Sequence, residues 1–130
     1  MFLTFRTEVV ATLATALPNV AGWDVIPDDV NELPCYVVGR PGGRPANEKI
    51  VMDLSLQVFI LGRRQQAGGS EDELVALADD VFTALGGTRG TKSPSGEVVT
   101  VSRVDPRTLS IAGNDVPAYS IEVTASAATC

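Results

Sequence analysis

Apolar residues recur at helical spacing near the start of the chain. They are Phe2, Phe5, Val9, Leu13 and Leu17, with Val10 and Ala14 beside them. Polar residues such as Arg6 and Glu8 take the other side, so the pattern predicts an amphipathic helix. The hydroxyl of Thr4 or Thr7 can cap its first turn. Pro18 ends the helix, because proline has no N–H to continue the hydrogen-bond ladder.

A second helical pattern lies between Ser70 and Gly87. Its apolar positions are Leu74, Leu77, Ala78, Val81, Phe82 and Leu85. Ser70 and Glu73 have the spacing of a capping box, in which each side chain bonds the other residue's backbone N–H. Gly86 and Gly87 end the pattern, because glycine tolerates the left-handed conformation of a helix C-cap.

The clearest strand runs from Ile50 to Leu61. Apolar residues at Met52, Leu54, Leu56, Val58 and Ile60 alternate with Asp53, Ser55, Gln57 and Phe59. This period of two predicts one face buried against the helices and one partly polar face directed towards a channel or a partner. The strand is longer than the usual 5–6 residues or so. Its exposed edge is therefore a candidate for pairing with a neighbouring molecule.

Shorter extended segments surround these elements. They are Trp23 to Ile26, Cys35 to Gly39, Val98 to Val104, Leu109 to Ile111 and Ala118 to Ala125. Turns are expected at Asp105-Pro106 and at Gly113 to Asp115, and the glycines and prolines of Arg40 to Lys49 predict an irregular loop. The order is α-β-β-β-α-β-β-β within a single domain, 1–130. Helices on one face of a mostly antiparallel sheet make this an α+β protein.

The composition argues against catalysis. The 130 residues include no histidine, which removes the commonest general base and transition-metal ligand. The two cysteines, Cys35 and Cys130, form no CxxC pair, and Cys35 is expected to be a buried thiol. The acid pairs Asp28-Asp29 and Asp79-Asp80 are explained by a turn and by a solvated helix face. We therefore expect no catalytic residue, no metal and no cofactor. We also expect no membrane segment, since no apolar stretch approaches the roughly 20 residues that are needed.

The formal net charge is −6, but the two signs are separated along the chain. Basic residues occur in three loops, at Arg40, Arg44 and Lys49, at Arg63 and Arg64, and at Arg89 and Lys92. Acids gather at Asp24 to Glu32 and at Glu71 to Asp80. Separated charge of this kind suits head-to-tail contact between identical subunits, although simple solvation explains any single loop equally well.

Taken together, these segments resemble the tail terminator proteins of long-tailed bacteriophages, also known as minor tail or neck proteins. The resemblance rests on the element order and on the segments FLTFRTEVVATLATALP, MDLSLQVFILGRR, SEDELVALADDVFTALGG and DVPAYSIEVTA. It implies a curved sheet with two helices packed on one face. It also implies a hexameric ring in the virion neck that caps the head-proximal end of the tail tube, made from subunits synthesised in the host cytoplasm. The partners would be the major tail tube protein and a head-completion protein, with DNA passing through the ring without specific binding.

The resemblance supplies no catalytic residue, so interface candidates come from loop and strand positions. They are Arg40, Arg44, Asp53, Arg63, Arg64 and Arg89. The arginines can contact DNA phosphates or carboxylates of a neighbouring protein. The protein contact is favoured, because firm phosphate binding would hinder the sliding of DNA. The closing segment SAATC is expected to be a free tail or an arm lying on a neighbour.

Three other functions remain as alternatives. One is a different neck or tail-tube component, although tube subunits are usually β-rich sandwiches, unlike a chain with two strong helices. Another is a small non-enzymatic binding module, which would be expected to have a concave apolar pocket. An enzyme is the least favoured, because the chain has no histidine.

Overall fold

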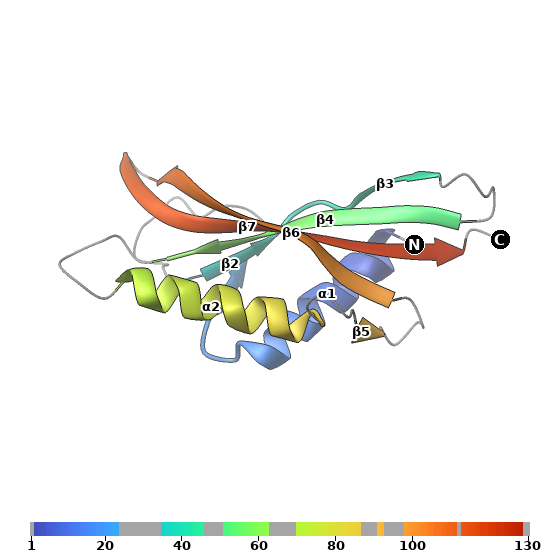
Figure 1. Ribbon diagram of the computed structural model, residues 1–130, viewed down its shortest axis with the longest axis horizontal. Coiled ribbons are helices and arrows are strands. Elements are labelled where there is room, and N and C mark those ends of the chain that lie inside the picture. The colour runs from blue at the N-terminus through green and yellow to red at the C-terminus, as the bar shows by residue number, and fades with distance from the viewer. Residues whose placement is uncertain are drawn as a thin grey trace.

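The computed structural model describes residues 2–23, 35–45, 51–62, 70–86, 91–92, 98–111 and 113–128. Its helices are α1 (Phe2–Ala16) and α2 (Ser70–Ala84). Its strands are β1 (Ala21–Trp23), β2 (Cys35–Val38), β3 (Gly42–Pro45), β4 (Val51–Leu61), β5 (Thr91–Lys92), β6 (Val98–Ile111) and β7 (Asn114–Ala128). One curved sheet carries both helices on the same face (Figure 1). The predicted α+β class is therefore confirmed, with one strand more before α2 than expected.

The sheet has the strand order β1-β2-β4-β7-β6-β5, and β3 pairs with β4 beyond the end of β2. Among the described strands, only β1 and β2 pair in parallel. β4 is a central strand, because β7 pairs with its whole length on one side while β2 and β3 share the other. The prediction that β4 offers a free edge is therefore wrong.

Part of the segment expected to be an irregular loop forms a strand that pairs with β4. Gly42–Pro45 is extended as β3 and pairs with Ser55 to Met52. Proline is tolerated here because Pro41 precedes the strand and Pro45 is its last residue, so neither interrupts the middle of the ladder. The prolines and glycines of this segment thus bound an edge strand and do not prevent one.

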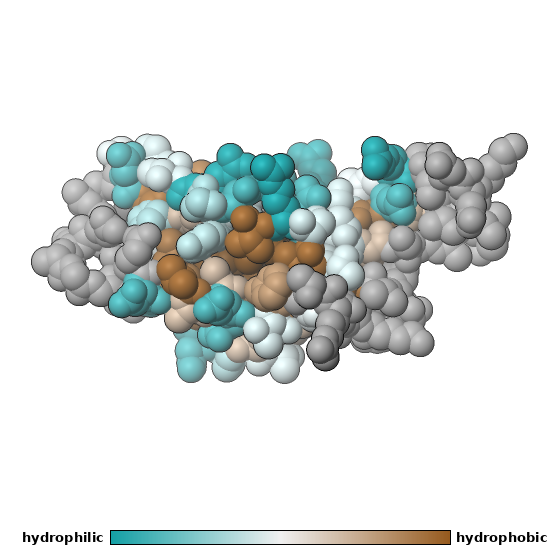
Figure 2. Space-filling view, viewed as in Figure 1, coloured by the Kyte–Doolittle hydropathy of each residue, from teal (hydrophilic) through white to brown (hydrophobic). Residues whose placement is uncertain are grey.

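The core lies between the helices and one face of the sheet. Its buried side chains come from α1 (Phe5, Val9, Leu13), α2 (Leu74, Val81, Leu85), β4 (Leu54, Leu56, Val58, Ile60) and β7 (Ile121, Val123, Ala125). Met52 is half-buried against the same core. The predicted face of the long strand is therefore confirmed. Apolar side chains also reach the surface between α2 and the sheet (Figure 2). Val75 of α2 and Val104 of β6 are among the exposed large apolar residues.

Both helices end as the sequence predicts. The last turn of α1 closes with the bond from Leu17 N to Leu13 O, at 2.8 Å, directly before Pro18. Gly86 follows α2 with φ at 87°, which is the left-handed conformation of a C-cap. The start of α1 differs from the prediction. The helix begins at Phe2, so Thr4 and Thr7 lie inside it and are not caps.

β6 and β7 form a long hairpin in place of the predicted meander. β6 continues through Asp105-Pro106, where a turn was expected. Pro106 is compatible with this because β6 lies at the edge of the sheet for most of its length, paired outwardly only at Val98 and Val99 by β5 within the described part of the chain. Gly113, with φ at 81°, makes the turn to β7, as expected.

β7 also continues further than expected, through Ala128. Its residues 126–128 pair with 51–53 of β4. The prediction of a free closing segment is therefore wrong for these residues, because the length of β4 offers them a partner. Thr129 and Cys130 lie outside the described residues.

Candidate functional site

The candidate site is the face of the sheet opposite α1 and α2. Because side chains alternate along a strand, burial of Leu54 and Leu56 under the helices turns Asp53, Ser55 and Gln57 to the other side. The register places Glu122 of β7 opposite Gln57, on that same side. This confirms that the second face of β4 is partly polar. We name the whole side of the sheet to which these residues point the open face.

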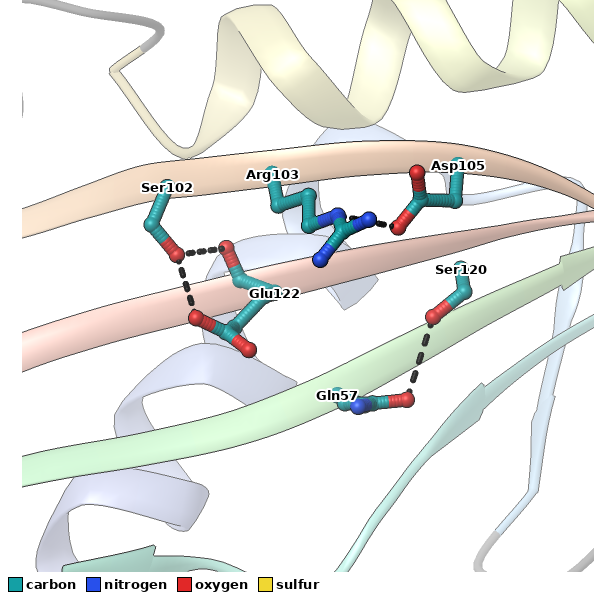
Figure 3. Close-up of polar contacts among 6 residues, drawn as sticks. All are labelled: Gln57, Ser102, Arg103, Asp105, Ser120 and Glu122. Atoms are coloured by element: carbon teal, nitrogen blue, oxygen red, sulfur yellow. Dashed lines mark hydrogen bonds and ion pairs between the residues drawn. The ribbon is translucent and has the colours of Figure 1, made fainter.

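Hydrogen bonds link the strands across the middle of the open face (Figure 3). Ser120, only 4% exposed, donates its hydroxyl to Gln57 Oε1 at 3.1 Å. Ser102 donates to Glu122 Oε1 at 2.7 Å. Ser102 lies at a register shift between Val101 and Arg103, and such a bulge re-aims a side chain. The polar groups at the centre of the open face are therefore held in place by one another.

Charged pairs lie on both sides of this centre. Arg103 Nε and Asp105 Oδ2 are 2.7 Å apart, but the arginine side chain is 71% exposed, so the pair contributes little to stability. In β3, Arg44 lies directly opposite Asp53 of β4. Opposite charges at such positions attract, and the contribution is roughly 0.2–1 kcal/mol. The structure thus brings together two of the interface candidates taken from the sequence.

A third candidate, Arg40, borders a shallow hollow on the open face. The hollow has a volume of about 400 Å³. Its lining comes from Gly39, Arg40, Gly42, Ser55, Leu56, Gln57, Phe59 and Glu122. Arginine, amide and carboxylate groups around an open depression suit a polar contact with another macromolecule. Arg63, Arg64 and Arg89, the remaining candidates, lie outside the described residues.

We expect Gly39→Ala to destabilise the rim of the hollow. Gly39 N donates to Gln57 O at 2.8 Å. A β-carbon on Gly39 would lie 2.9 Å from the same backbone oxygen, so β2 or β4 must shift. The expected loss is about 1–3 kcal/mol of unfolding free energy, measured by urea denaturation.

Gly42→Ala is the matched control for this substitution. A β-carbon there meets nothing within 4 Å, so its free energy of unfolding should stay within about 0.5 kcal/mol of the parent. Equal stability of the two variants would contradict the close approach of Gly39 to β4.

An apolar cluster occupies one end of the open face. Its buried members are Cys35, Val37, Leu61, Val116 and Ala118. Cys35 is a buried thiol, as the sequence predicts. In β2, Tyr36 points to the opposite side, into the main core, where burial raises the pKa of its hydroxyl above the ordinary value. This end of the sheet is therefore packed on both faces, which leaves the middle and the β3 end as the surface for contacts.

The sequence indicated only part of this site. In the last strand, Ser120, Glu122 and Thr124 alternate with apolar residues in the sequence, which agrees with their position on the open face. The sequence did not reveal the contacts of Ser102 and Asp105, because the register shift after Val101 becomes apparent only when β6 is aligned with β7. The available signal was weak: valines at 98, 99, 101 and 104 break strict alternation, which is typical of a bulge.

The described residues contain no group of three or more potential metal ligands. None of the described helices is long and apolar enough to cross a membrane. Neither the protein-family models nor the curated proteins that were compared with this chain match its sequence.

Proposed function

We propose that this protein is a tail terminator subunit. In this proposal, copies assemble into a hexameric ring on the head-proximal end of a phage tail tube, end the growth of the tube and join the tail to the head. The observation that carries the proposal is the architecture: both helices cover one face of a curved sheet, as the family resemblance implies (Figure 1). The opposite face carries exposed charged side chains, among them Arg40, Arg44 and Asp53.

The length of the strands supports a role in assembly. β6 has 14 residues and β7 has 15. At about 3.3 Å per residue, strands of this length span roughly 45–50 Å. They extend beyond the helix-covered core, and a subunit of this shape can reach a neighbour in a ring and also a partner above or below it.

Addition of the purified protein to growing tail tubes tests the proposed function. The tubes would be assembled from a purified major tail tube protein, the partner that the proposal names. We expect electron microscopy to show a ring of identical copies at one end of each tube and no further growth from that end. Tubes that grow normally and carry no ring would contradict the proposal. Parallel tubes without the protein provide the control.

A further inference from the structure

The acids of α2 and the arginines of the open face lie on opposite sides of the sheet. On α2, three aspartates, Asp72, Asp79 and Asp80, are exposed, and the helix contains no basic residue. On the open face, Arg40 and Arg44 are exposed near β3. The separation of charge along the sequence is therefore also a separation in space, with the sheet between the two groups.

The acidic face of α2 also has a suitable shape for docking. Its exposed positions include Val75, which is 40% exposed, and the small residue Ala76, between the aspartates. The adjoining surface shows apolar side chains between α2 and the sheet (Figure 2). An apolar centre with charged flanks is the usual composition of a protein interface.

We propose that the acidic face of α2 docks against the arginine-bearing hollow of a second copy of this chain. The contact deepens the proposed ring and rests on that proposal. Arg40 and Arg44 supply planar guanidinium groups, which can grip a carboxylate with two parallel hydrogen bonds. The hollow of about 400 Å³ beside them is bordered by glycine backbone at Gly39 and Gly42, so a helix carrying a small residue can approach closely.

The positions of the two surfaces determine the symmetry of the contact. In a twofold dimer, α2 and the hollow of one copy would both have to contact the same partner. They lie on opposite faces of one sheet, so a single partner cannot contact both. Each copy therefore uses α2 against one neighbour and the hollow against another. Such a head-to-tail contact closes into a ring when the rotation between the copies permits.

The charges favour a protein over DNA as the occupant of the hollow. Asp53 lies directly opposite Arg44, and Glu122 lines the hollow beside Arg40. These carboxylates lower the positive potential that a run of phosphates requires. One or two aspartates set on a helix suit the small number of arginines better than a continuous polyanion does.

Charge reversal tests the contact. The acidic variant is Arg40→Glu with Arg44→Glu, and the basic variant is Asp79→Lys with Asp80→Lys. Each alone should remain folded by circular dichroism and weaken self-association by about tenfold or more, because attraction becomes repulsion. An equal mixture of the two should restore assembly, and so should one chain with all four changes, because the reversed charges are again complementary.

Assembly would be measured by sedimentation velocity at low salt and by ring formation on tail tubes. Arg107→Glu and Asp115→Lys reverse exposed charges that belong neither to α2 nor to the lining of the arginine-bearing hollow, and they should leave assembly unchanged. If the parent protein forms rings and the acidic and basic variants also form them, the proposed contact is overturned and the proposed function stands. If the parent protein neither self-associates nor caps tubes, the proposed function itself fails.

Discussion

Replacement of Leu56 with aspartate is expected to abolish folding. Leu56 lies in the central strand, is 3% exposed and belongs to the core that both helices cover. An unpaired charge buried there costs several kcal/mol, and the lost apolar contacts add to that loss. A domain of this size is stable by only about 5–15 kcal/mol. Circular dichroism and urea denaturation would measure the effect.

Gln57→Asp is the control for this substitution. Gln57 is the next residue of β4, but it is exposed on the open face. A carboxylate there remains in water, but it loses the bond from Ser120 and lies opposite Glu122, so we expect a modest loss of about 1–2 kcal/mol. If Leu56→Asp folded with the same urea midpoint as Gln57→Asp, the assignment of the two faces of β4 would be wrong.

The sequence predicted those parts of the fold that depend on local periodicity. In β4 the alternation of Leu54, Leu56 and Val58 with polar residues defined both the strand and its buried face. The stripe that includes Leu74 and Val81 similarly defined α2 and the side of it that packs. Hydrophobic burial determines which side turns inwards, so these predictions required no knowledge of the rest of the chain.

Features that depend on pairing between distant segments were not predictable in this way. The glycines and prolines around Gly43 suggested a loop, whereas pairing with β4 makes this segment an edge strand. Asp105-Pro106 suggested a turn, whereas β7 pairs with the residues on both sides of it and keeps β6 continuous. In each case the tertiary hydrogen-bond ladder outweighs the local propensity.

The candidate site was also predictable only in its local features. Arg40, Arg44 and Asp53 were identified individually, from charge and from their positions in a loop and a strand. The placement of Arg44 opposite Asp53 depends on the register between β3 and β4, which the sequence does not contain. The bond between Ser102 and Glu122 likewise depends on a bulge in β6.

Truncation of Leu13 to alanine is expected to produce a large loss of stability without changing the surface. Leu13 is 0% exposed and packs in the main core beneath α1. Removal of its side chain leaves a cavity that the surrounding sheet can close only in part. The expected cost is about 2–5 kcal/mol of unfolding free energy, measured by urea denaturation.

Leu3→Ala makes the same chemical change on the same helix and is the matched control. Leu3 is 76% exposed, so truncation of its side chain leaves no cavity. The unfolding free energy should change by no more than about 0.5 kcal/mol. The two variants share a helix and a substitution and differ only in the burial of the leucine. A similar loss from both would mean that α1 does not pack on the sheet through Phe5, Val9 and Leu13.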